Sequence, residues 1–220
     1  MPAKTRTTHS KARAHGGRPP LGAEARQIIL DATAAVFLER GFASASTSEI
    51  AERAHTSKQT LYRLFPTKAD LFVGVIGGYT NSLFDRHVEF VESDRAPRET
   101  LNEMGRMILG LFADPTFLAL YRILVAETHR FPDLAKRLWS DCMERGYAKL
   151  GDYLRSKRLG GPAYRKAAHK FISLVLGDFV VNAVLNPDVK FSPKALRARV
   201  SEAVDDFLLL YGAKPGKGRR

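Results

Sequence analysis

The segment SKQTLYRLFPTK, Ser57 to Lys68, holds three basic residues and two aromatic residues and contains no acid. Leu61 and Phe65 are four residues apart, so in a helix they share one face, which we expect to be buried. The serine at position 57 can cap this helix, and the proline at position 66 ends it. The residues left to face outward at its start are Lys58, Gln59, Thr60 and Tyr62.

A second short helix is predicted just before this one, over residues 46–54. Its sequence opens with Ser46, and Glu49 three residues later completes the pattern of a capping box. Ile50 and Ala51 are expected to face inward, and the small alanine lets two helices cross closely. Two short helices joined by the tight turn HTS have the layout of a helix-turn-helix motif.

The outward residues of the second helix suit DNA. A recognition helix presents its first residues to base edges in the major groove. Gln59 can pair with adenine, and Thr60 can donate a hydrogen bond or contact a thymine methyl group. Lys58, Arg63 and Lys68 suit phosphates. The alternative is a solvated basic face on an ordinary helical hairpin, and charge alone does not separate the two.

The rest of the chain also reads as helical. Several prolines stand where a helix can begin, because a first-turn N–H has no intrahelical partner. No segment alternates with a period of two, so we predict an all-α fold of about nine helices. The expected ranges are 24–40, 46–54, 57–65, 68–91, 97–112, 115–130, 132–158, 162–185 and 193–210.

Residues 26–76 resemble the DNA-binding domain of the TetR family of bacterial transcriptional regulators. The matching pattern is Phe-x-x-x-Gly at the end of the first helix, then Ile-Ala-x-x-Ala, then Ser-x-x-Thr-Leu-Tyr-x-x-Phe and a nearby Lys. The resemblance implies a dimer on a palindromic operator and a C-terminal domain whose ligand releases DNA. It also implies base contacts from Gln59 and Thr60, and phosphate contacts from Ser46, Tyr62, Arg63 and Lys68.

Three positions depart from the family pattern. His55 stands in the turn where glycine is usual, and histidine tolerates a positive φ better than most residues. Arg63 replaces a common histidine, which makes that phosphate contact permanently charged. Gln59 stands where a small residue is frequent, so we expect added adenine readout and an operator unusual for the family.

The N-terminal arm contains a second candidate DNA contact. Arg18 lies in the segment HGGRPP, between glycines and prolines. Arginine inserts well into narrow A·T-rich minor grooves. The alternative is a tether that makes no contact.

Composition and the resemblance to the TetR family together divide the chain into four parts. Residues 1–20 carry five basic residues and no acid, and residues 212–220 carry four and no acid, out of a net charge of +12. We expect a disordered basic arm over 1–20 and a basic tail over 212–220. Residues 21–67 are the expected helix-turn-helix domain, and residues 68–211 the helical ligand-binding and dimerisation domain.

The ligand and dimer surfaces are expected in the C-terminal part. Its segment from Tyr121 to Trp139 resembles the C-terminal domain of AefR-like members of the family. An apolar stripe there is either core or pocket lining, and the predicted ligand-binding residues are Phe117, Tyr121, Leu124 and Trp139. A small apolar or aromatic effector would suit them. In the family the last two helices pair across a two-fold axis, which makes the predicted dimer residues Phe171, Val175, Phe179, Val204, Phe207 and Leu208.

Three glycines, Gly74, Gly77 and Gly78, lie in the helix that should join the two domains. Each costs about 1 kcal/mol relative to alanine inside a helix. Either these glycines allow close packing against a neighbouring element, or they soften the connecting helix so that it moves when ligand binds.

Catalysis, cofactors and metals are not expected. The six histidines have no metal-ligand spacing, and the sequence has no phosphate loop and no nucleophile motif. The lone cysteine, Cys142, fits a reducing compartment, and no apolar segment forms a secretory signal or a membrane span. We therefore predict a cytoplasmic bacterial repressor, associated with the nucleoid when bound. The alternative is an architectural DNA-binding protein that controls a protein partner.

Overall fold

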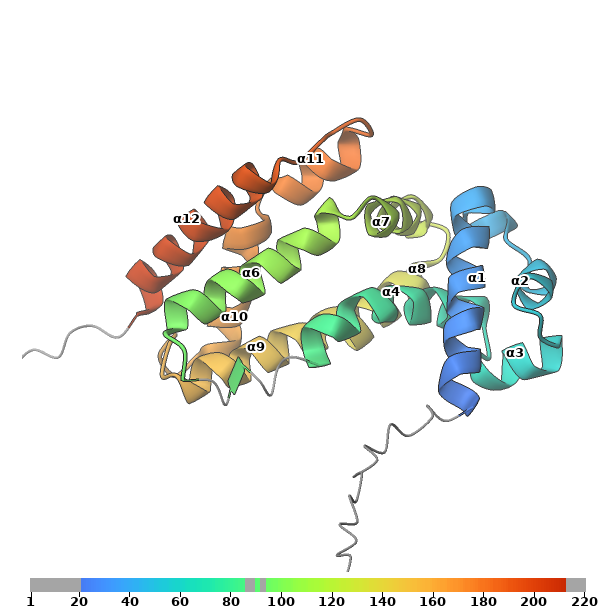
Figure 1. The fold of residues 1–220 in the computed structure, drawn as a ribbon, viewed down its shortest axis with the longest axis horizontal. Coiled ribbons are helices and arrows are strands. Elements are labelled where there is room, and N and C mark those ends of the chain that lie inside the picture. Colours follow the sequence, from blue (N-terminus) through green and yellow to red (C-terminus); the bar gives the residue numbers. More distant parts are fainter. Residues whose placement is uncertain (1–20, 86–89, 92–93, 213–220) are drawn as a thin grey trace, which may run out of the picture.

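The computed structural model describes residues 21–85, 90–91 and 94–212, and within these ranges it is all-α, with no strand (Figure 1). This confirms the predicted fold class. Arg18 and the charged part of the C-terminal tail, 213–220, lie outside the described residues. Within the described ranges, no single helix has both the length and the apolarity needed to cross a membrane. Two bent pairs of helices, Pro97–Ala113 with Pro115–Glu127 and Tyr164–Leu176 with Phe179–Leu185, reach that threshold jointly.

Three helices form one end of the molecule: α1 (Leu21–Ser44), α2 (Thr47–Arg53) and α3 (Lys58–Leu64). Gly41 adopts φ 73°, so the regular part of α1 stops at the glycine that the sequence marked as its end. The buried anchors of the helix pair are Ile50, Ala51, Leu61 and Phe65, as the spacing predicted.

Both predicted serine caps are present. The Ser46 hydroxyl accepts from the Ser48 N–H at 3.2 Å, and the Ser57 hydroxyl accepts from the Thr60 N–H at 3.0 Å. The reciprocal half of the capping box is absent, because the Glu49 carboxylate pairs with Arg53 at 2.7 Å instead. In the turn between the helices, His55 has φ 49°, the conformation expected where the family has glycine.

Helix α4 (Lys68–Asp85) leads from this end into the larger helical layer (Figure 1). The described helices that follow are α6 (Pro97–Ala113), α7 (Pro115–Glu127), α8 (Pro132–Leu138), the π-helix η1 (Trp139–Met143), α9 (Glu144–Ser156), α10 (Tyr164–Leu176), α11 (Phe179–Leu185) and α12 (Pro193–Tyr211). Helix α10 packs against α9, α12 and α6, and α1 packs against α7 and α4.

Two helices predicted as continuous are irregular. The predicted helix 132–158 contains a π-helical turn, in which the Glu144 N–H donates to the Trp139 carbonyl five residues earlier. The predicted helix 162–185 bends by 48° between α10 and α11. Gly177 supplies the break with φ 41°, and the Arg199 guanidinium donates to the freed carbonyls of Val175 and Leu176.

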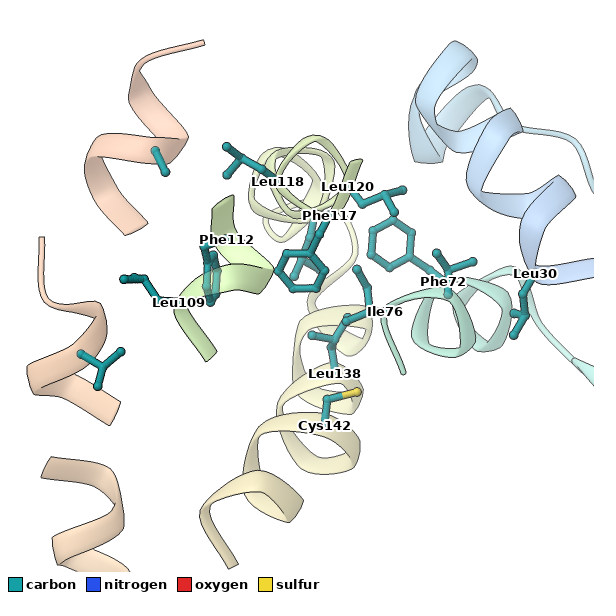
Figure 2. Close-up of a cluster of buried hydrophobic side chains, with 14 of the residues drawn as sticks. Leu30, Phe72, Ile76, Leu109, Phe112, Phe117, Leu118, Leu120, Leu138 and Cys142 are labelled. Atoms are coloured by element: carbon teal, nitrogen blue, oxygen red, sulfur yellow. The ribbon is translucent and has the colours of Figure 1, made fainter. Parts of the chain in front are cut away.

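One continuous apolar core joins the two ends. Figure 2 shows Phe72 and Ile76 of α4 beside Leu120 of α7 and Leu138 of α8. The core continues into the helix-turn-helix end through the rings of Phe37, Phe42 and Phe72, whose centroids lie 5.3–5.7 Å apart. Packed side chains therefore connect α8 with α1 through one continuous core.

The three glycines of α4 differ in their surroundings. A Cβ added at Gly74 would lie 2.8 Å from both Leu30 and Phe65, so close packing requires the glycine there. A Cβ at Gly77 or at Gly78 would meet nothing within 4 Å. Close packing therefore accounts for Gly74 and leaves the other two as candidates for a softened connector.

Candidate nucleic-acid interface and apolar cavity

The outer face of α3 is polar and basic. Lys58, Gln59, Tyr62 and Arg63 are exposed, while Leu61 is fully buried. The sequence therefore predicted the inward position of Leu61 and the outward positions of Lys58, Gln59 and Tyr62, whereas Thr60, also expected to face outward, is partly buried. Less than two turns of helix present two cations, an amide and a phenol to solvent.

Thr60 and Tyr62 each make a hydrogen bond within the helix pair. The Thr60 hydroxyl is partly buried and lies 3.0 Å from the Ser57 hydroxyl, so it takes part in the cap of α3. The Tyr62 hydroxyl lies 2.9 Å from that of Thr47, the first residue of α2. The sequence interpretation missed Thr47, because only the crossing of the two helices brings it to Tyr62.

Lys68 occupies a different environment from the cations of α3. Its ammonium donates to the carbonyls of Ala43 at 3.0 Å and Ala45 at 3.1 Å, and lies 4.9 Å from the centre of the Phe42 ring. Burial lowers the pKa of Lys68, and the charge of Glu127 opposes that shift. The Lys68 side chain thus connects the end of α1 to the start of α4. This structural role is independent of the phosphate contact predicted for it.

A second link at the start of α4 joins this helix to α8. The Asp70 carboxylate accepts from the Thr67 N–H at 2.8 Å and forms an ion pair with Arg137 of α8. Burial opposes ionisation of Asp70, but the hydrogen bonds from Thr67 and Arg137 outweigh it, so the pKa of this carboxyl is lowered. The ion pair connects the helix-turn-helix end to the helix that continues into η1.

An apolar cavity of about 130 Å³ lies among α4, α6, η1, α9 and α10. Apolar cavities of about 150 Å³ hold a molecule of the size of benzene. The described residues that line it are Thr80, Phe90, Met104, Met107, Ile108, Leu111, Phe112, Cys142, Met143, Gly146, Tyr147, Lys149, Leu150, Ile172 and Leu176. Burial raises the pKa of the Cys142 thiol, which keeps it protonated.

The four predicted ligand-binding residues are not among those that line the cavity. Phe117 and Leu124 are buried in the core, because α7 packs against α1 rather than facing the cavity. Tyr121 packs edge-on against Phe112 with ring centres 5.2 Å apart, so it supports a lining residue from behind. Trp139 is 52% exposed, and its indole N–H donates to Glu144.

The residues that do line the cavity include all three methionines after Met1 and the single cysteine. Cys142 and Met143 belong to the π-helix, whose wider turn changes which side chains face inward. π-Helical turns inside α-helices are frequent at functional sites. Within the described ranges, no group of three or more His, Cys, Asp or Glu side chains could hold a metal ion.

Comparison with known proteins agrees with this arrangement of a helix pair and a larger helical domain. Residues 29–75 match the N-terminal domain described as bacterial regulatory proteins, tetR family, and residues 99–213 match the AefR-like transcriptional repressor C-terminal domain. The chain belongs to the TetR family of bacterial regulatory proteins. The resemblance noted from the sequence is confirmed for both halves.

Individual TetR-family relatives are similar over different lengths. The transcriptional repressor KstR of Mycobacterium tuberculosis is 41% identical over 100 residues, which are 43% of this chain and 46% of KstR. A TetR-family structure from Mesorhizobium loti has a TM-score of 0.74 at 24% identity, over 88% of this chain and 99% of that one. The flavonoid-responsive regulator FrrA has a TM-score of 0.68 at 29% identity, with the same coverage. The chain spans 27–64% of the length of the curated relatives it matches.

The C-terminal helices of this TetR-family chain place most of the predicted dimer residues inside. Phe171, Val175, Val204 and Phe207 are fully buried within the chain, and Phe179 is 7% exposed. Their side chains offer almost no surface to a partner, because the apolar stripes of α10 and α12 pack against each other and against α6. Leu208 is partly exposed. The large apolar side chains exposed on α11 and α12 are Val181, Leu185, Leu209 and Leu210.

Proposed function

We propose that this TetR-family chain is a repressor that binds a palindromic operator as a dimer and is released by a small apolar or aromatic molecule. The observation that carries the proposal is the outer face of α3, where exposed Lys58, Gln59, Tyr62 and Arg63 follow a capped helix start. Base readout by Gln59 and phosphate contacts by the other three explain why these residues avoid the core.

The roles of the remaining predicted DNA contacts follow from their surroundings. The hydroxyl of Thr60 is already hydrogen-bonded to that of Ser57, so we assign Thr60 a smaller share of base readout than Gln59. Ser46 is exposed at the start of α2, where its hydroxyl can also reach a phosphate. Lys68 contributes chiefly by fixing α4 to α1. Arg18 remains a proposed minor-groove contact.

The effector site that we propose is the apolar cavity, in place of the stripe that includes Tyr121 and Trp139. Thr80 of α4 lines it, so a ligand contacts the helix that carries Lys68 at its other end. The core contacts of α4 and the Asp70–Arg137 ion pair give the ligand a physical route to α1. FrrA, described as flavonoid-responsive, shows that a relative with this fold responds to an aromatic small molecule.

The dimer surface that we propose uses the exposed apolar residues of α11 and α12. Val181 and Leu185 are one helical turn apart on α11, and Leu209 and Leu210 are in the last turn of α12. Single exposed apolar residues are common on protein surfaces, but these four are large and highly exposed and lie on two helices that are consecutive in the chain. Replacing both Leu185 and Leu209 with Arg should give a monomer by light scattering, whereas Lys194→Ala on α12 should leave the dimer intact.

The test of the whole proposal is a selection of the purified protein against random DNA duplexes at several salt concentrations. We expect a palindromic motif and an affinity that falls steeply with salt. Salt-sensitive binding without any motif would favour the architectural alternative. The cavity favours the repressor, because an architectural protein has no need of a ligand-sized void.

The effector half is tested separately with Ile108→Trp, which fills the cavity. This variant should bind the operator as the wild type does and should no longer be released by an apolar ligand. Release that persists in Ile108→Trp would mean that the effector binds elsewhere. Lys170→Met, on the exposed face of α10, is the matched control.

A further inference from the structure

Helix α11 carries two of the four residues of the proposed dimer surface, Val181 and Leu185, yet it is too short to fix its own direction. It has seven residues and follows Gly177, where the backbone breaks with φ 41° and the helix axis bends by 48°. A glycine in such a break permits several backbone conformations. The direction of α11 therefore depends on the elements that pack against it, which include α6 and α7.

One side chain of α7 holds the far end of α11. The Arg122 guanidinium donates to the carbonyls of Ala183 at 2.5 Å, Val184 at 3.1 Å and Asn186 at 3.1 Å. The last carbonyls of a helix have no partner within the helix, and the helix dipole favours a positive charge beside them. Because the planar guanidinium engages three acceptors at once, it fixes the orientation of α11 as well as its distance from α7.

Helix α7 also packs against α1, the first helix of the helix-turn-helix end. It therefore lies between α11 and α1 (Figure 1). Helix α1 in turn packs against α2, and α2 packs against α3. Arg122 thus lies on the connection between the proposed dimer surface and the helix that bears Gln59.

Resting on the proposed dimeric function, we propose that Arg122 is a positioning residue that sets the spacing of the two recognition helices in the dimer. Half-sites of a palindromic operator lie about one turn of DNA apart, so one inserted base pair moves a half-site by about 3.4 Å and rotates it by about 35°. A dimer whose α11 is held in one orientation rejects this insertion. A dimer whose α11 can turn tolerates it.

The test measures operator spacing rather than affinity alone. The palindrome that the wild type selects is remade with one base pair inserted or removed between its half-sites, and each duplex is compared with a single half-site. We expect the wild type to prefer its own spacing by about tenfold, as for one mismatched base pair. Arg122→Met removes all three hydrogen bonds, so it should reduce the preference to about threefold or less and leave half-site affinity unchanged.

Two further variants accompany Arg122→Met. Arg122→Lys keeps the charge but lacks the planar fork of donors, so its spacing preference should lie between those of the wild type and Arg122→Met. Arg106→Met removes a guanidinium from the exposed face of α6 and should keep the wild-type preference. Light scattering and thermal unfolding establish that each variant is a folded dimer. If Arg122→Met does not dimerise, Arg122→Lys decides the test.

A second measurement needs no DNA. Spin labels on Glu52→Cys, at the exposed surface of α2, report the distance between the two helix-turn-helix ends of a dimer. The background is Cys142→Ser, which removes the one native cysteine. We expect a narrow distance distribution with Arg122 present and a broader one in Arg122→Met.

Wild-type spacing preference and a narrow distance distribution in both Arg122 variants would overturn the proposal and leave the dimeric repressor standing. Equal loss of affinity for the single half-site would also overturn it, because the effect would then lie in the fold of the helix-turn-helix end. A wild type that binds its palindrome equally at every spacing contradicts this inference alone. A wild type that selects no palindrome contradicts the dimeric function as well.

Discussion

The helix pair α2–α3 and the cavity region differ in where their chemistry is located. In the helix pair it lies on the outside, in side chains such as Gln59 and Arg63 that local helical periodicity directs to solvent. In the cavity region it lies inside, in a void bounded by α4, α6, α10 and the continuous helix of η1 and α9, which are distant from one another in sequence. A surface is specified by short-range pattern, whereas a void depends on how whole helices are packed.

The largest expected effect comes from removing Phe65, the buried side chain that holds α3 against the core. Phe65→Ala deletes a ring that is 1% exposed and that Arg26 of α1 covers at 4.3 Å. It should lower the free energy of unfolding by about 3–5 kcal/mol. Denaturant titration measures this, and Tyr62→Phe is the control, since it keeps a ring that is 45% exposed and loses only the hydrogen bond to Thr47, so it should lower stability by about 1 kcal/mol or less. Equal losses would mean that the inward and outward faces are misassigned.

The next effect concerns readout on that face. Gln59→Ala should weaken binding to the selected operator by about 1–3 kcal/mol and relax the preference at one base pair. Lys58→Ala should instead weaken binding to all sequences alike and reduce the salt slope by about 1. Competition binding with single-base operator variants separates the two. An unchanged base preference in Gln59→Ala would remove this residue from the readout.

Lys68 sharpens the comparison because it lies between the two regions. Lys68→Met keeps the stem but loses the bonds to Ala43 and Ala45, and should lower the free energy of unfolding by about 1–2 kcal/mol. Lys58→Met, on the exposed face, should leave stability unchanged and affect DNA binding alone. Thermal and denaturant unfolding, measured beside DNA affinity, check both. If the Lys68→Met variant is as stable as the wild type but binds DNA weakly, the role of Lys68 is a direct phosphate contact rather than a structural link.

The smallest effect separates two glycines of the connecting helix. Gly74→Ala should destabilise by about 1 kcal/mol, because overpacking against Leu30 and Phe65 exceeds the gain in helix propensity. Gly78→Ala meets nothing within 4 Å and should stabilise by about 0.5–1 kcal/mol. Denaturant unfolding distinguishes the signs.

The pair Gly77→Ala and Gly78→Ala then tests the connector hypothesis without steric conflict. If the helix must soften, the double variant should bind operator normally and release it less readily. Unchanged release would show that these glycines have no part in the response.

Much of the fold could be predicted from the sequence, since proline positions, serine caps and apolar spacing are local signals. The inward residues of the helix pair were predicted on that basis, whereas the positive φ of His55 was expected from the resemblance to the family, which usually has glycine at this position. The predicted ligand-binding residues of α7 do not line the cavity, because the apolar face of α7 packs on α1. Most of the predicted dimer residues are buried for the same reason, because an apolar stripe does not reveal whether it packs against the same chain or against another.

The π-helical turn of Trp139–Met143 behaves as one residue too many in an otherwise regular helix from Pro132 to Ser156. Loss of that one residue would restore ordinary winding and leave α9 in its present orientation, because the wider π-helical turn absorbs the extra residue. If the same residues were instead wound as an uninterrupted α-helix, α9 would rotate by about 100° relative to α8, and Tyr147, Lys149 and Leu150 would turn away from the void together. The π-helical turn is therefore what keeps these side chains in the cavity wall while the chain carries an additional residue.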